Sequence, residues 1–151
     1  MPLADGLAFR PITRQRATEL RRAGGVPYVA DAAPGYPCRQ CLRDAEIGDE
    51  LILVSHDPFT GDSPYRSASP IFLHRDDCGE PDLTDVPQQL AVRSLSLHAF
   101  DADEMMLDAA LVDGAALADS ALALFERADV VAVHVHNQPR GCWATSIERS
   151  P

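Results

Sequence analysis

The segment from Val130 to Glu148 reads VVAVHVHNQPRGCWATSIE, and it carries the clearest local pattern in the chain. Apolar and polar side chains alternate in residues 130–136 and again in residues 142–148, and the five residues NQPRG separate these two runs. Alternation with a period of two is typical of half-buried strands, and a short loop with Gly is typical of a hairpin connection. The segment therefore predicts a C-terminal β-hairpin.

The expected register of this hairpin pairs His136 with Cys142. Because side chains alternate along a strand, this pairing divides the hairpin into an apolar and a polar face. The apolar face is predicted to hold Val131, Val133, Val135, Trp143, Thr145 and Ile147, and the polar face His134, His136, Cys142, Ala144 and Ser146. We expect the hairpin to pack on the core through Val133, Val135, Trp143 and Ile147.

Outward from the hairpin, the remaining patterns are shorter. Thr13 is expected to cap a helix over 14–23 that ends at Gly24-Gly25, and a second helix is expected over 114–127. Strands are expected at 7–12, 51–54, 71–74 and 92–97, whereas the proline-rich stretch 27–37 predicts a loop and 105–112 fits either a strand or a helix. The fold class predicted is α+β: one domain over residues 1–151, with a mostly antiparallel sheet of about six short strands covered by two helices.

Composition excludes several classes of protein. The 151 residues include 23 Asp plus Glu against 13 Lys plus Arg, which gives a net charge of −10, and all 13 basic residues are arginine. An acidic chain lacks the basic footprint of a nucleic-acid binder, and a chain without lysine has no Schiff-base or phosphate-loop lysine. The start has no signal-peptide pattern and the longest apolar-rich run, 115–125, is too short to cross a bilayer. We therefore expect a cytoplasmic protein that binds neither nucleic acid nor membrane.

The strongest chemical signal is two spaced pairs of metal-ligating residues. Cys38-Arg-Gln-Cys41 is followed, after 32 residues, by His74-Arg-Asp-Asp-Cys78. Zinc prefers thiolate and imidazole ligands in a tetrahedral shell, and two ligand pairs separated by a loop are a common way to supply one. The spacing predicts a zinc site formed by Cys38, Cys41, His74 and Cys78. A closed shell of four protein ligands would be structural, whereas three ligands would leave a position for water and for catalysis.

Two other interpretations of the cysteines remain open. Cys38 and Cys41 are also consistent with small buried apolar residues, and with a redox or nucleophilic role. In the second chemical interpretation, Cys142 or Cys38 acts with His136 as an activated thiol in an enzyme or redox protein, since a thiol beside an imidazole forms a reactive thiolate. His56, which precedes Asp57, is a weaker candidate because neighbouring residues on a strand point to opposite faces.

Several short motifs occur together and in a fixed order between about Gly35 and Arg149. They are Pro37-Cys38-Arg39, Leu42, Asp44-Ala45, Pro64-Tyr65-Arg66, Ile71-Phe72, Val135-His136-Asn137, Gly141-Cys142 and Arg149. In these the chain resembles a bacterial family known as domain of unknown function 1203. The resemblance implies a small stand-alone bacterial protein and supplies no activity.

Cys38, Arg39, His136, Asn137 and Cys142 match the general pattern of that family. The resemblance also implies that many relatives have serine in place of Cys41 and lack the His74 and Cys78 pair, so zinc would belong to one branch. The function expected is that of a small zinc-binding protein with an interaction or regulatory role toward a protein or small-molecule partner. The alternative is the thiol-dependent enzyme or redox protein, and the sequence leaves open whether the chain is an enzyme.

Overall fold

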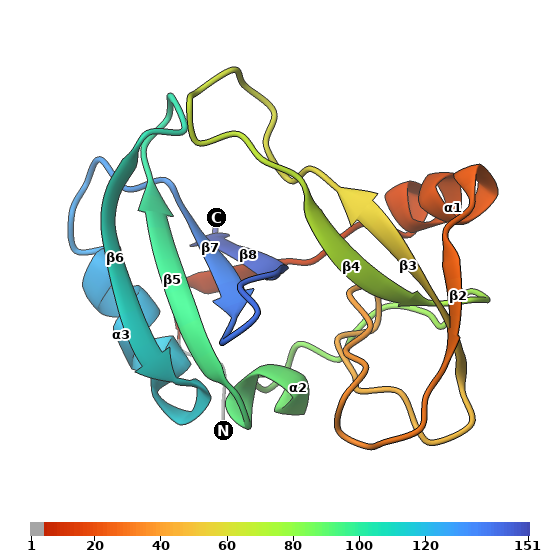
Figure 1. Cartoon of the computed structure of the whole chain (residues 1–151). Helices are drawn as coiled ribbons and strands as arrows, with labels where there is room; N and C mark the ends of the chain where they lie inside the picture. The colour runs from red at the N-terminus through yellow and green to blue at the C-terminus, as the bar shows by residue number, and fades with distance from the viewer. Residues whose placement is uncertain (1–4) are drawn as a thin grey trace.

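The computed structural model describes residues 5–151, and Figure 1 shows its elements in chain order. The strands and helices are β1 (Leu7–Arg10), α1 (Arg14–Ala23), β2 (Val26–Val29), β3 (Glu50–His56), β4 (Ser69–His74), α2 (Gln88–Ala91), β5 (Ser94–Phe100), β6 (Met106–Asp113), the 3-10 turn η1 (Gly114–Ala116), α3 (Leu117–Leu124), β7 (Ala132–Asn137) and β8 (Trp143–Arg149). The predicted α+β class and the C-terminal hairpin, β7–β8, are both confirmed.

The strands form two antiparallel sheets where the sequence predicted one. The larger sheet has the order β1-β8-β7-β5-β6, and the smaller one has the order β2-β3-β4. In Figure 1 the two sheets lie side by side, with α3 on the outer face of the larger sheet and α1 beside the smaller one. Alternation within a strand indicates which residues face a core but not which sheet the strand joins.

The first helix follows its sequence signals closely. Thr13 is extended, and its side-chain oxygen accepts a hydrogen bond from the backbone N–H of Arg16 at 3.1 Å. Gly24, with φ +86°, follows the last residue, and its N–H donates to carbonyls in the last turn. A side-chain cap at one end and a glycine at the other fix the predicted bounds of 14–23.

The predicted strands are recovered with bounds that differ by a few residues, and three other stretches differ more from their prediction. The stretch predicted as a loop from residue 27 contains β2, because β2 is an edge strand, and an edge strand tolerates Pro27, which cannot donate a ladder hydrogen bond. The ambiguous stretch after residue 104 is the strand β6. The helix predicted over 114–127 begins as the 3-10 turn η1 and continues as α3, which ends at Leu124.

The predicted register of the hairpin is wrong. His136 pairs with Trp143 rather than with Cys142, and a register shift lies between Val135 and His136, whereas Val135 pairs with Thr145. An extra residue on one strand turns the following side chains to the opposite face. Trp143 therefore leaves the face of the valines, and Ala144 joins it.

The buried apolar side chains form two main clusters. The larger lies between the five-stranded sheet and α3, and includes Leu97, Leu117, Val133, Val135 and Ile147. The second is made by α1, the smaller sheet and β8, and its buried members are Ile12, Ala17, Leu20, Cys38, Cys41, Val54, Ile71, Leu73 and Trp143. Trp143, predicted to pack with the valines, thus connects the hairpin to the smaller sheet. This second cluster positions the candidate site.

No helix among the described residues has both the length and the apolar character that crossing a membrane requires.

Candidate functional site

The first ligand pair lies in a loop that is tied to the smaller sheet. The backbone N–H of Cys38 donates to the carbonyl of Arg43 at 3.1 Å, which closes the loop on itself. The N–H of Arg39 donates to the carbonyl of Phe72 in β4 at 3.0 Å, and an isolated bridge joins Cys38 to the same residue. Leu42 adopts φ 52°, so the chain turns sharply directly after Cys41. These bonds fix both thiols at the end of β4.

The second ligand pair begins at that same strand end. His74 is the last residue of β4, and Cys78 lies in the turn that follows. The register of the smaller sheet pairs His74 with Leu51 of β3. Arg21 of α1 donates from Nε to the carbonyl of His74 at 2.9 Å, which holds the strand end against the helix.

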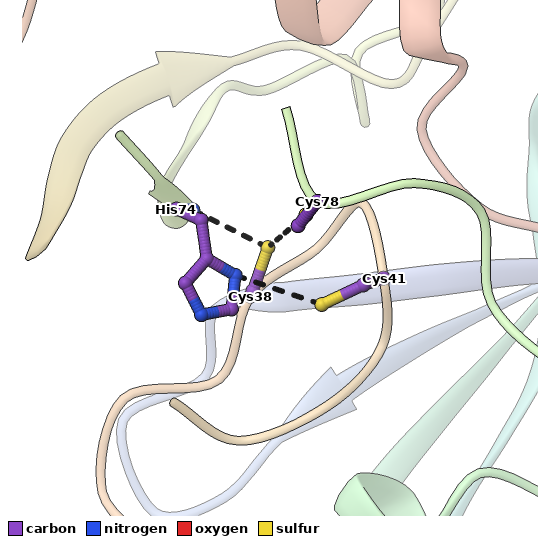
Figure 2. Close-up of side chains that lie close together, drawn as sticks. All are labelled: Cys38, Cys41, His74 and Cys78. Carbon is purple, nitrogen blue, oxygen red and sulfur yellow. Dashed lines mark hydrogen bonds between the residues drawn. The ribbon is translucent and has the colours of Figure 1, made fainter. Parts of the chain in front are cut away.

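The four predicted ligands converge, as Figure 2 shows. Their ligand atoms all lie within 4.8 Å of one another. The Sγ atoms of Cys38 and Cys78 are 3.7 Å apart, and Sγ of Cys41 is 3.6 Å from Nδ1 of His74. Cys38 and Cys41 are buried, and His74 and Cys78 are half-buried. Cys38, Cys41, His74 and Cys78 thus form one cluster that is able to hold a metal ion.

The histidine of the cluster has a second partner that fixes its orientation. Nδ1 of His74 faces the thiols, while Nε2 lies 3.2 Å from Oδ2 of Asp49. A carboxylate that accepts the outer N–H of an imidazole sets its tautomer and makes the inner nitrogen a better metal ligand. Asp49 is itself held in place, because its carboxylate accepts the backbone N–H of Glu46 at 2.9 Å.

Arg39 ties the ligand loop to the larger sheet. Its guanidinium is almost completely buried, and it donates from Nε to the carbonyl of Trp143 at 2.8 Å and from Nη1 to the carbonyl of Pro37 at 2.6 Å. Burial lowers the pKa of Arg39 to about 10, so the side chain stays protonated at neutral pH. Gln89 of α2 adds a hydrogen bond of 3.1 Å to the carbonyl of Cys38. Side chains from both sides of the loop therefore hold the cluster rigidly.

The electrostatics of the cluster favour a cation. Hydrogen bonds from Cys41 and then from Cys78 lower the pKa of the Cys38 thiol. Hydrogen bonds to Cys38 and then to Cys41 raise the pKa of His74 to about 10, and the same two thiols raise the pKa of Cys78. The cluster thus gathers negative charge on sulfur and holds protons on neighbouring ligands. A divalent ion that replaces those protons would neutralise the thiolates.

Fold and cluster together define a small α+β protein with a cysteine and histidine group suited to a metal ion. The chain belongs to the family described as protein of unknown function (DUF1203), whose model matches residues 35–149. The matched range includes all four members of the cluster, and it confirms the resemblance found in the sequence. Comparison with curated proteins and with solved structures gave no match.

Two of the three residues of the alternative thiol site, His136 and Cys142, lie outside this cluster. Cys38 belongs to the cysteine and histidine cluster, whereas Cys142 does not. Nδ1 of His136 lies 2.8 Å from the carbonyl of Gly141, and its ring stacks on that of His98 at a centroid distance of 4.5 Å. No hydrogen bond between Cys142 and His136 is present in residues 5–151. A nucleophilic role for Cys142 or Cys38 with His136 stays a prediction.

Sequence reasoning missed Asp49 and Gln89, which support the cluster without belonging to it. Asp49 precedes β3 by one residue, and the pairing of β3 with β4 brings it beside His74. Gln89 belongs to α2, a helix that the sequence did not predict. In the sequence, Asp49 is recognisable only as a carboxylate shortly before a predicted strand. Its position beside His74 follows only once the register of that strand is known.

One neighbouring histidine gives a testable pH dependence of stability. His134 is 6% exposed, and burial, with smaller contributions from His136 and His98, lowers its pKa to about 4. Its unfolded pKa is about 6.5, so between these values the unfolded chain binds a proton that the folded chain does not. Above about pH 6.5, His134 is neutral in both states and leaves the free energy of unfolding unchanged. As the pH falls toward 4, the unfolded chain gains this proton and the free energy of unfolding decreases. The loss amounts to about 3 kcal/mol.

The substitution His134→Phe should remove this component while keeping an aromatic ring among Phe59 and Phe100. Urea unfolding of both proteins between pH 4 and pH 7 measures the effect. Because the two proteins share the same cysteine cluster, the difference between their curves isolates His134. Parallel curves would contradict the prediction.

Proposed function

We propose that the protein binds one structural zinc ion through Cys38, Cys41, His74 and Cys78. The observation that carries the proposal is the convergence of the four ligand atoms within 4.8 Å of one another. Three thiols and one imidazole form a set that zinc prefers, and harder ions such as magnesium and calcium prefer oxygen ligands. Four protein ligands fill a tetrahedral shell, which is typical of structural zinc rather than catalytic zinc.

The distances within the cluster support zinc geometry. Zinc–sulfur bonds of about 2.3 Å and zinc–nitrogen bonds of about 2.0 Å in a tetrahedron place two sulfurs about 3.8 Å apart, and a sulfur and a nitrogen about 3.5 Å apart. The separations in the protein are 3.7 Å for Cys38 to Cys78 and 3.6 Å for Cys41 to His74. Little movement of the side chains would be needed to bind the ion.

The role proposed for the zinc is to connect parts of the fold. Its ligands would join the Cys38 loop to the end of β4, and Arg39 extends that connection to β8. A filled shell leaves no position for a substrate on the metal, which favours an interaction or regulatory role over catalysis at the ion. We place the protein in the cytoplasm, where thiols stay reduced and available to zinc, and its partner is a protein or a small molecule.

The test is metal content. We expect the purified protein to hold one zinc per chain, and Cys41→Ser to lose it, because a hydroxyl replaces one thiolate ligand. Cys142→Ser is the matched control: Cys142 is also a free cysteine but lies outside the cluster, so this variant should keep its zinc. Inductively coupled plasma mass spectrometry on dialysed protein measures the ratio. Wild-type protein without zinc, even after refolding in its presence, would reject the proposal.

A further inference from the structure

A cavity of about 510 Å³ lies where the two sheets meet, on elements other than those that carry the metal cluster. The end of β3 and the loop after it contribute His56 and Phe59, while β5, β7 and β8 contribute Phe100, His134 and Trp143. Small-molecule sites commonly have volumes of about 300 to 1,000 Å³, aromatic walls and a few polar groups. This cavity has that size, and its wall combines three aromatic residues with several polar and charged ones.

Two of the lining side chains are buried imidazoles with unused hydrogen-bonding capacity. His56 is 8% exposed and His134 is 6% exposed, and Nδ1 of each is buried without a hydrogen-bond partner. Buried polar atoms in folded proteins nearly always have a partner, so two at one cavity call for an explanation. A half-turn of either ring about its Cβ–Cγ bond exchanges the positions of Nδ1 and Cδ2, and the ring keeps the same outline. The Nδ1 atom of each histidine can therefore lie on either side of its ring.

Aromatic rings surround both imidazoles. The ring of His56 lies 5.2 Å from that of Trp143, and the ring of His134 lies 4.9 Å from Phe59 and 4.8 Å from Phe100. Such faces provide stacking surfaces for a planar ring. The walls therefore select a flat aromatic molecule over a branched aliphatic one.

The charged residues that line the cavity already have partners. Arg10 pairs with Glu148 at 3.1 Å, and Arg16 pairs with Glu19 at 3.2 Å. Asp57 pairs with Arg66 at 2.7 Å, whereas Asp101 and Glu104 accept backbone N–H groups and keep their negative charge. Both imidazoles are neutral at pH 7, because burial lowers the pKa of each. The lining therefore has no unpaired cation for an anionic ligand, and the carboxylates of Asp101 and Glu104 would repel one. A neutral imidazole instead offers one donor and one acceptor.

We propose that this cavity binds an uncharged planar nitrogen heterocycle, with His56 and His134 as hydrogen-bonding residues and Trp143, Phe59 and Phe100 as the stacking walls. A heterocycle of this class, such as a nucleobase or a pyridine carboxamide, carries donors and acceptors on its edge and an aromatic face. The site is independent of the proposed zinc ion, since none of the four metal-cluster residues lines the cavity.

The chain offers a built-in reporter for this binding. Trp143 is the only tryptophan among the 151 residues, and it lines the cavity. A titration of tryptophan fluorescence at pH 7.5 therefore reports on the site directly. The probes are adenine, cytosine and nicotinamide, which are uncharged at this pH, and nicotinate, which has the ring of nicotinamide but carries a charge.

At least one uncharged probe should change the fluorescence with Kd below about 1 mM, and nicotinate should bind about tenfold more weakly than nicotinamide where the latter binds. His134→Phe and His56→Phe should each weaken binding about tenfold, which is the loss of one hydrogen bond. His98→Phe is the matched control, because His98 lies on the same sheet but does not line the cavity.

A second measurement on the wild-type protein removes any dependence on the folding of the variants. The imidazole Cε1–H resonances of His56 and His134 should shift on binding, and that of His98 should not. The proposal is overturned if none of the three uncharged probes binds, if nicotinate binds as tightly as nicotinamide, or if binding leaves the resonances of both lining histidines unchanged.

Discussion

Removal of the proposed zinc ion with a chelator should lower the free energy of unfolding by several kcal/mol and loosen the smaller sheet first. An ion that binds only the folded protein stabilises it by about 4 kcal/mol when its free concentration is a thousand times Kd. Structural zinc in small peptides binds with on the order of 10 kcal/mol, and here an existing core shares the task of folding. The apo protein should remain folded but melt at a lower temperature.

The loss should be local, because the cluster joins particular elements. Without the proposed ion, no metal would join Cys38, Cys41 and Cys78 to His74, so the ligand loop would be held to β4 mainly by the backbone bond from Arg39 to Phe72. The side chain of Arg39 would remain as the polar tie to β8. The amide of Arg39, which donates to Phe72, should therefore exchange with solvent faster in the apo protein. Amides in the β5–β7 pair, which lies over the other core, should keep their protection.

Hydrogen-exchange mass spectrometry of the wild type, with and without chelator, measures both parts of this prediction. Cys142→Ser should respond as the wild type does, since its thiol lies outside the cluster. Cys38→Ser should resemble the chelated wild type before any chelator is added. A melting temperature that chelation leaves unchanged, together with uniform exchange, would show that zinc does not connect these elements.

The four residues of the cluster could be predicted from sequence because their signal is local. Each ligand pair lies within five residues, so the spacing alone indicates two arms, and the structure brings them together. The supports could not be predicted in the same way. Asp49 reaches His74 only through the pairing of β3 with β4, and Arg39 reaches Trp143 across 104 residues of chain. Such partners depend on the tertiary fold.

The hairpin shows the same limit at the level of the backbone. Alternation predicted both strands, and it placed Val133, Val135 and Ile147 on the core face correctly. It placed Trp143 on that face too, since a bulge leaves no mark in an alternating pattern. The shift changes the lining of the proposed binding cavity, because Trp143 lies in its wall. The alternating pattern thus predicted both strands, whereas the register shift between them determines that Trp143 faces the cavity.

Gly114→Ala should destabilise the protein by about 3 kcal/mol or more, although helix propensity predicts the opposite sign. A Cβ atom at this position would overlap the carbonyl oxygen of Leu90 and would lie 2.8 Å from the carbonyl oxygen of Arg93. Both are backbone atoms, the first within α2 and the second just after it, so no flexible side chain is able to move aside. The N–H of Gly114 donates to that same carbonyl of Arg93 at 2.7 Å, which holds the two segments at this close approach.

Helix propensity and the close backbone approach predict opposite changes in the stability of Gly114→Ala. The sequence predicted that Gly114 opens a helix, and alanine is favoured over glycine in helices by about 1 kcal/mol. If local propensity dominated, the variant would be as stable as the wild type or more so. Gly35→Ala is the matched control: its Cβ would meet Ala32 at 3.6 Å, an ordinary contact, so little change is expected. In urea unfolding, a clear loss for Gly114→Ala beside a near-neutral Gly35→Ala would show that the close approach of two backbone segments, rather than helix initiation, requires glycine at position 114.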